Sequence, residues 1–301
     1  MNMKSVLRHA PVFAAALCIL GTAFPSSALA AKFPPLNSPA TTEHLSGKLV
    51  WADLITTNPE AAAKFYCELL GWTAAPLEQK GKGYTVFSNN NVPVAGLAPR
   101  TASSGSHPAR WIGYYAVADI DAVLALATKN GATMRAPSRN FPDRGRQAIF
   151  TDKDGIPIGI LQSSSGDTAD ADPAPGGWNW FELYVKNPES TGDFYHAVIG
   201  FDATAETNSD RKSDLVLSSE GRARGGVAPL SGEDPKPSWL GVIRVADLDA
   251  TLAKVPGLGG EVLLAPHAVE YGSRFAIILD STGGTVGLVQ YADDANPAKS
   301  K

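Results

Sequence analysis

Hydrophobic residues recur at helical spacing in the stretch that follows residue 58. Positions i, i+3, i+4 and i+7 are filled by Ala62, Phe65, Tyr66 and Leu69. This is the pattern of an amphipathic helix. Asn58 before Pro59 is a suitable N-cap, and Gly71 ends the helix. Asp119 and Gly131 bracket a second helical pattern in the same way.

Strand-like runs surround these helices. Residues 49–58 and 111–119 each form such a run and end in Asn or Asp directly before a helix. After the helices come short β-rich runs, which are YTVFS, PVAGLAP, QAIFT and IPIGILQ. The alternation of strand side chains places residues 51, 53 and 55 on one face and Leu54 on the other, beneath the helix. The pattern in each quarter of the chain therefore predicts one strand, then a helix, then about three more strands.

The second half of the chain repeats the first. WADLITTNPEAAAKFYCELLGW at residues 51–72 is matched by WFELYVKNPESTGDFYHAVIGF at residues 180–201. GLAP recurs as GVAP, WIGYYAVADIDAVLA as WLGVIRVADLDATLA, and RQAIFTDKDGIPIGILQ as RFAIILDSTGGTVGLVQ. These matches indicate a tandem duplication of a unit of about 115 residues.

The chain also divides by composition. Its start runs from a short basic region through an apolar stretch to the small-residue site Ala28-Leu29-Ala30, which predicts a secretory signal peptide cut after Ala30. The segment SSSGDTADADPAPGG lacks large apolar residues and predicts a flexible linker. The predicted organisation is a signal peptide (1–30), an N-terminal tail (31–46), a first domain (47–163), the linker (164–177), a second domain (178–292) and a C-terminal tail (293–301).

Composition and charge narrow the class of protein. A hydrophobic content of 44% is typical of a globular protein. Loss of the signal peptide lowers the formal charge from −4 to about −6, and no Lys/Arg cluster offers phosphate contacts. We expect a periplasmic or secreted protein with no nucleic-acid partner and no membrane association after cleavage. Cys67 is then the only thiol, and we interpret it as a helix-face residue rather than a nucleophile.

A β-α-β-β-β module used in pairs, with a Phe-Tyr helix and an Asp-x-x-Gly turn before the last strand, resembles the vicinal oxygen chelate superfamily. Glyoxalase I, bleomycin-resistance proteins and extradiol dioxygenases belong to this superfamily. The resemblance extends from about Gly47 to Ala292 and is strongest to a bacterial two-domain glyoxalase-like branch. It implies an α+β fold in which four modules form two cup-shaped domains, and it fixes no reaction.

The positions that hold a divalent metal in other members of this superfamily carry no ligand side chain here. The first-strand positions fall on Trp51, Ile112, Trp180 and Leu240, and the last-strand positions on Gly159 and Gly287. The histidines after the signal peptide lie in predicted loops or on a helix, at unrelated places in the two halves: His44, His107, His196 and His267. Metal sites need three or four converging donors, so we predict no metal and no cofactor.

The cups offer aromatic rings and a few charges instead. Alternation places Trp51, Asp53 and Tyr114 in the first cup and Trp180, Glu182 and Arg244 in the second. We include Arg146 and Arg274 as further candidate ligand-binding residues. Such a lining suits a small, flat, partly polar molecule. The alternative is that the tryptophans are core residues and that the two acids bind backbone N–H groups or pair with Arg146 or Arg274.

These observations favour an exported, metal-independent module that binds a small aromatic or amphipathic molecule in one or both cups. An alternative is a lyase, isomerase or hydroxylase-type enzyme that uses Asp53 or Glu182 as the acid/base group. A third is a structural partner with collapsed cups. No serine-nucleophile, dinucleotide or nucleotide motif is present, and the oligomeric state is left open.

Overall fold

The structure is a computed structural model that describes residues 32–77, 83–101, 109–205, 214–230, 236–269 and 272–292. The predicted signal peptide and the predicted C-terminal tail lie outside these residues. The first half forms one eight-stranded sheet in the order β2-β3-β4-β1-β5-β8-β7-β6. Its strands are β1 (Leu49–Thr56), β2 (Thr73–Pro76), β3 (Thr85–Asn89), β4 (Val92–Pro99), β5 (Arg110–Ala116), β6 (Thr133–Phe141), β7 (Gly145–Thr151) and β8 (Pro157–Ser163).

The second half repeats this sheet in the order β10-β11-β12-β9-β13-β16-β15-β14. Its strands are β9 (Trp178–Val185), β10 (Asp202–Ala205), β11 (Leu215–Ser219), β12 (Arg222–Pro229), β13 (Ser238–Arg244), β14 (Glu261–Ala268), β15 (Arg274–Leu279) and β16 (Thr285–Gln290). In each sheet the two central strands, β1 and β5 or β9 and β13, pair antiparallel, and each also has a parallel neighbour. The predicted α+β tandem duplication is confirmed.

The helices begin where the sequence predicted. They are α1 (Pro59–Leu70), α2 (Ile120–Lys129), α3 (Pro188–Ile199) and α4 (Leu248–Lys254), followed by the short 3-10 helix η1 (Pro256–Leu258). The Asn58 side chain accepts a hydrogen bond from Ala61 N, and Gly71 ends α1 with a φ of 73°. Among the described residues, no helix combines the length and hydropathy needed to cross a bilayer.

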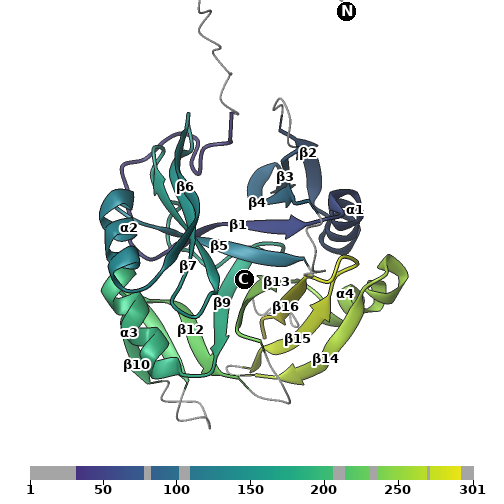
Figure 1. The fold of residues 1–301 in the computed structure, drawn as a ribbon. Coiled ribbons are helices and arrows are strands. Elements are labelled where there is room, and N and C mark those ends of the chain that lie inside the picture. The colour runs from purple at the N-terminus through teal and green to yellow at the C-terminus, as the bar shows by residue number, and fades with distance from the viewer. Residues whose placement is uncertain are drawn as a thin grey trace, which may run out of the picture.

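The two domains share one hydrophobic core. Figure 1 shows α1 beside α4 and α2 beside α3, at the two flanks where the upper (first) domain meets the lower (second) one. The Tyr66 hydroxyl on α1 donates to Asp280 Oδ2 of the second domain (2.8 Å), and the Tyr195 hydroxyl on α3 donates to Asp152 Oδ2 of the first (3.0 Å). The Phe-Tyr and Asp-x-x-Gly motifs therefore meet across the domain boundary, once in each direction.

The segment between the domains is bonded to the N-terminal segment. Ser165 Oγ accepts from Leu36 N (2.9 Å), and Asn37 Nδ2 donates to the carbonyls of Gly166 and Asp167 (3.0 and 2.8 Å). We expected a flexible linker because this stretch is polar and has small side chains. The structure corrects that expectation, since the polar groups that cannot build a core fix the segment by hydrogen bonds.

Candidate functional site

The first cup encloses a carboxylate that has no free oxygen. Trp51 and Asp53 lie on the same face of β1, as alternation predicted, and Asp53 is only 4% exposed. Asp53 Oδ1 accepts from Trp51 Nε1 (2.9 Å) and from the Tyr84 hydroxyl (2.5 Å), while Oδ2 accepts from the Tyr114 hydroxyl (2.8 Å). Because both oxygens are paired and buried, Asp53 is poorly placed to take a proton from a substrate.

The pKa shifts of Asp53 and its two tyrosine partners agree with this closed arrangement. Burial raises the pKa of Asp53 above its usual range, although the bonds from Tyr84, Tyr114 and Trp51 and the nearby Arg144 charge oppose the shift. Burial and the neighbouring carboxyl also raise the pKa of Tyr84 and Tyr114 well above 10.0. The two phenols therefore remain protonated donors.

Arg144 is a buried cation in the same cup that sequence reasoning missed. Its side chain is fully buried, and its guanidinium carbon lies 3.9 Å from the ring centroid of Trp51. Arg144 Nε donates to the carbonyl of Pro34 (2.7 Å). Within the described part of the chain, Nη1 and Nη2 have no hydrogen-bond acceptor. The residue lies between Asp143 and Gly145, both with positive φ, where no strand periodicity signals an inward side chain.

The N-terminal segment closes this cup. Phe33 is 5% exposed, and its ring centroid lies 4.8 Å from that of Tyr84 and 4.5 Å from that of Phe141. Leu36 packs against the same cluster. The first cup is therefore filled by the protein's own side chains, which corrects the expectation of an accessible Trp51–Asp53 lining.

The glycines at the last-strand metal positions are covered by rings. A Cβ atom on Gly159 would come within 2.4 Å of the Tyr114 ring, and one on Gly287 within 2.8 Å of the Phe275 ring. The described residues contain no group of three or more His, Cys, Asp or Glu side chains that could hold a metal ion; His107 lies outside them. In the first cup, Tyr114, which donates to Asp53, also fills the space beside Gly159, where other members of the superfamily carry a metal-ligand side chain.

The second cup has a different lining around the equivalent acid. Trp180 Nε1 donates to Glu182 Oε2 (2.5 Å), and both residues are only half-buried. The strand registers place Asp214, Val242 and Gly272 where the first domain has Tyr84, Tyr114 and Arg144. The phenols and the guanidinium that seal the first cup therefore have no counterparts here.

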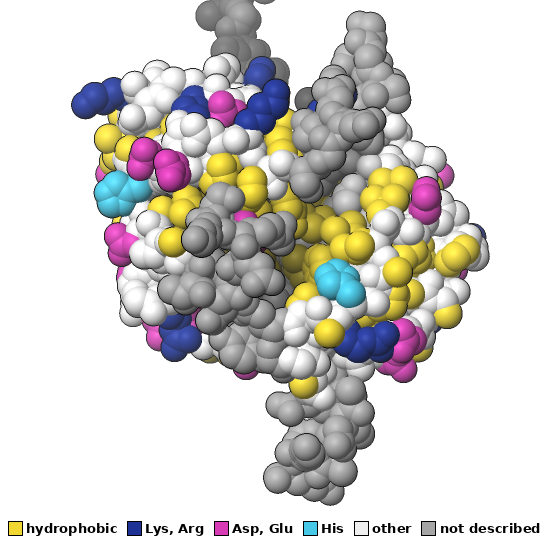
Figure 2. Space-filling model, turned by 90° about the horizontal axis from the view of Figure 1, so that it is seen from below, with side chains coloured by type: hydrophobic (Ala, Val, Ile, Leu, Met, Phe, Trp, Pro, Cys, Tyr) yellow, Lys and Arg dark blue, Asp and Glu magenta, His cyan; other side chains and the backbone are white. Residues whose placement is uncertain are grey.

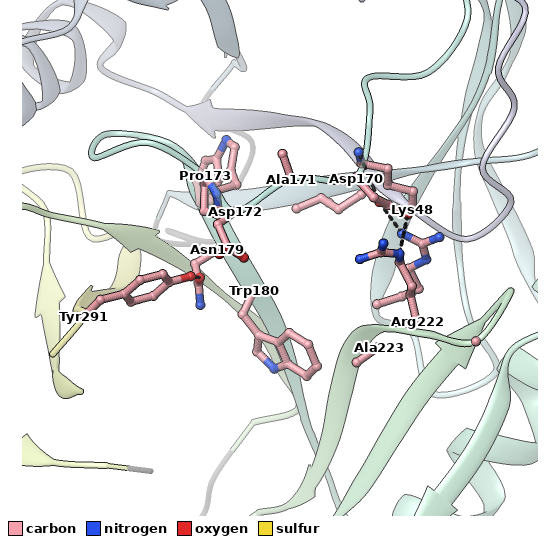
Figure 3. Close-up of a pocket in the computed structure, with 14 residues that line it drawn as sticks. Lys48, Asp170, Ala171, Asp172, Pro173, Asn179, Trp180, Arg222, Ala223 and Tyr291 are labelled. Atoms are coloured by element: carbon pink, nitrogen blue, oxygen red, sulfur yellow. Dashed lines mark hydrogen bonds and ion pairs between the residues drawn. The ribbon is translucent and has the colours of Figure 1, made fainter. Parts of the chain in front are cut away.

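A pocket of about 660 Å³ opens beside Trp180. In Figure 3, Tyr291 and Asn179 lie on one side of the Trp180 ring, and Lys48, Asp170 and Arg222 lie on the other. Figure 2, which views the molecule from below, shows hydrophobic side chains gathered in a central hollow of that face. The pocket thus combines aromatic surface with charged groups.

The charged wall comes from both domains and from the segment between them. Asp170 lies 3.3 Å from Lys48 Nζ, 2.6 Å from Arg224 Nη1 and 3.4 Å from Arg222 Nε. Partial burial opposes ionisation of Asp170, but the bond from Arg224 and the Lys48 charge outweigh it and lower its pKa. The Arg222 side chain is 64% exposed, so it is the cation best placed to meet a ligand.

The remaining predicted site residues fall in two places. Arg244 lies with its guanidinium carbon 4.0 Å from the ring centroid of Tyr291, and its Nη1 donates to the Pro173 carbonyl (2.8 Å), so it supports the pocket from behind an aromatic ring. Arg146 and Arg274 instead pair with Asp121 and Asp249, both exposed on helices.

Arg146 and Arg274 therefore do not line either cup. The prediction that these two arginines bind the ligand is corrected. They are not ion-pair partners of Asp53 or Glu182 either. Cys67 is half-buried on α1, and burial, with a smaller contribution from Glu68, raises the pKa of its thiol. A raised pKa disfavours the thiolate that a nucleophile needs.

Comparisons with known proteins place this chain in one superfamily. The family model described as "Glyoxalase/Bleomycin resistance protein/Dioxygenase superfamily" matches residues 48–160 and again 177–288. A protein named "Putative glyoxylase CFP32" from Mycobacterium bovis is 31% identical over 84% of this chain and 98% of its own length. "Anthracycline biosynthesis protein DauV" from Streptomyces sp. is 29% identical over 85% of this chain and 98% of its own length.

Solved structures share the fold at low sequence identity. The Mn(II)-bound glyoxalase from Novosphingobium aromaticivorans superposes with a TM-score of 0.59 at 14% identity, over 82% of this chain and 83% of that one. The 2,3-dioxygenase LapB from Pseudomonas sp. KL28 gives a TM-score of 0.56 at 14% identity, over 83% of this chain and 93% of that one. At this identity the likeness concerns the fold alone.

Proposed function

Because this chain belongs to the glyoxalase/bleomycin resistance protein/dioxygenase superfamily, we propose that it is an exported protein that binds a flat, partly polar aromatic molecule in the pocket of its second domain, without a metal. The observation that carries the proposal is the pocket beside Trp180, with Tyr291 and Asn179 on one side and Arg222 on the other. Its volume of about 660 Å³ lies within the range usual for small-molecule sites.

The chemistry of the walls defines the ligand class. The rings of Trp180 and Tyr291 offer flat apolar surface, and Arg222 offers a charge that a carboxylate, sulfonate or phenolate could approach. Two relatives carry names in anthracycline biosynthesis, and anthracyclines contain a planar, oxygen-substituted ring system. These names support a flat aromatic ligand of this kind for the present chain.

Export rests on the predicted signal peptide, and metal independence on the residues at the family's metal positions. Elemental analysis of the purified protein tests the second part. We expect substoichiometric Fe, Mn, Ni and Zn, and no change in Tm after EDTA treatment. A stoichiometric metal whose removal lowers Tm would reject metal independence while leaving the binding pocket to be tested separately.

Isothermal titration with anthraquinone-2-sulfonate tests the pocket. Trp180→Ala should weaken binding at least about 30-fold, since an aromatic anchor at the centre of a site typically contributes about 2 kcal/mol or more. Arg222→Ala should weaken binding of this anionic probe, whereas Arg139→Ala on exposed β6 is the matched control and should not. Equal affinities in wild type and Trp180→Ala would rule out this pocket.

A second candidate function is an enzyme that uses Glu182 as its acid/base group. The observation that favours it is that Glu182 lies half-buried on β9, two residues after the pocket-lining Trp180 that donates to it, in contrast to the sealed Asp53. Glu182→Gln keeps the size of the side chain and removes its charge. Conversion of a bound aromatic probe by wild type and not by Glu182→Gln would favour the enzyme, whereas binding without conversion by both would favour the binding module.

A further inference from the structure

The N-terminal strap, residues 32–37, occupies the first cup in the way that a ligand would. The Phe33 ring packs between the rings of Tyr84 and Phe141, with centroid distances of 4.8 and 4.5 Å. The carbonyl of the next residue, Pro34, accepts a hydrogen bond from Arg144 Nε (2.7 Å). An aromatic ring and an acceptor oxygen are thus presented together to a buried pocket of aromatic side chains and one cation.

The Arg144 guanidinium has N–H donors that do not bond to the strap. Its side chain is fully buried against Trp51, and Nη1 and Nη2 lack an acceptor in the described residues. Asp53, the only carboxyl of this cup among the described residues, accepts from Trp51, Tyr84 and Tyr114 and not from Arg144. A buried guanidinium with unpaired donors is costly, so an anionic group that reached it would gain strong, charge-assisted bonds.

The strap is also poorly packed on one side. A cavity of about 260 Å³ is lined by the strap residues Lys32, Phe33, Pro34 and Pro35 on one side and by residues 75–77 and Val86 on the other. The strap's backbone is held at its far end, where the amides of Leu36 and Asn37 donate to Ser165 Oγ (2.9 and 3.3 Å). Release of these two bonds would let the strap swing outward while the chain beyond Thr41, whose amide bonds Ser165 O (2.9 Å), stays in place.

We propose that the strap is a displaceable internal ligand and that the first cup, once uncovered, binds an aromatic acid through Arg144 and the rings around Trp51. The ring of the acid takes the place of Phe33, and its carboxylate meets the Nη donors that Pro34 leaves unused. This site is separate from the pocket beside Trp180 and does not depend on the function proposed for that pocket.

Hydrogen–deuterium exchange of the full-length protein with benzoate tests the displacement. Benzoate should increase deuterium uptake at the Leu36 and Asn37 amides, because their bonds to Ser165 loosen as the strap leaves. Simple stabilisation by a ligand would change exchange in the opposite direction. Trp180→Ala should show the same increase, which separates this site from the second-domain pocket. Unchanged or reduced uptake at saturating benzoate in wild type would overturn the proposal.

Affinity gives an independent measurement. Phe33→Ala removes the internal competitor and should bind benzoate at least about tenfold more tightly than wild type, since binding no longer has to displace the strap. Benzyl alcohol, which has the ring without the anion, should bind Phe33→Ala much more weakly than benzoate does. In the Phe33→Ala background, Arg144→Met should abolish benzoate binding. If that variant does not fold, the wild-type and Phe33→Ala data decide alone: no gain in affinity in Phe33→Ala would reject the strap as a competitor.

Discussion

The two cups are built on duplicated strand motifs, Trp51-Ala-Asp and Trp180-Phe-Glu, but the first cup is closed and the second has a pocket beside it. In the first, the acid accepts three hydrogen bonds and is sealed beneath the N-terminal strap. In the second, the acid accepts from Trp180 and stays half-buried next to an open pocket. A strand motif alone therefore does not make a site, because the neighbouring strands decide whether its carboxylate is a structural acceptor or a half-buried group beside a pocket.

The largest difference between the two cups is expected when the tryptophan of each cup is removed in turn. Trp51→Ala opens a cavity beneath Arg144 and removes a donor to Asp53, so it should lower the free energy of unfolding by about 3–5 kcal/mol. Trp180→Ala, on a half-buried ring, should cost about 1 kcal/mol or less. Urea unfolding measures both. Similar losses for the two variants would mean that the second cup is as closed as the first.

A smaller effect is expected at the boundary between the domains. Tyr66→Phe leaves Asp280 Oδ2 without its phenol donor and Trp111 Nε1 without its acceptor, and should cost about 1–3 kcal/mol. Tyr195→Phe removes the corresponding bond to Asp152 and should cost less than Tyr66→Phe. Thermal unfolding of both variants checks the order. Two separate transitions in either variant would show that the shared core does not couple the domains.

The smallest expected effect is a pH dependence from Asp53. Burial raises the pKa of Asp53 in the folded state, so folding favours its protonated form. Its contribution to stability is therefore greatest below the unfolded pKa, about 3.9, and falls as the pH rises through the folded value. The difference in unfolding free energy between wild type and Asp53→Asn should shrink over that window. A difference that grows with pH would mean that the hydrogen bonds to Asp53 outweigh its burial.

Local chemistry made much of the fold predictable. The helix periodicity, the Asn58 cap and Gly71 specify α1 without reference to the rest of the chain. Strand alternation alone placed Trp51, Asp53 and Tyr114 on the inner face of the first cup. The internal duplication then extended each assignment to the second domain.

The parts that could not be predicted depend on segments without periodicity. Arg144 follows a residue with positive φ and points inward, while Arg146, two positions later, pairs with Asp121 on α2. The strap and the segment at residues 164–177 have compositions typical of linkers, and their hydrogen bonds to one another are specific to the folded chain. Lys48 and Tyr291 meet at the pocket from opposite ends of the sequence, which no local pattern reveals.

We propose that the flat aromatic ligand enters the second domain next to Trp180, whereas the strap closes the cup next to Trp51 to a ligand of this kind. A titration of the ¹⁵N-labelled protein with anthraquinone-2-sulfonate reports on both in one experiment, because the indole N–H of each tryptophan gives its own signal. We predict that the Trp180 signal moves first, with that of the neighbouring Trp178, which also lines the pocket, while the Trp51 signal stays fixed. A shift of the Trp51 signal with the Trp180 signal unchanged would reject the second-domain pocket as the ligand site.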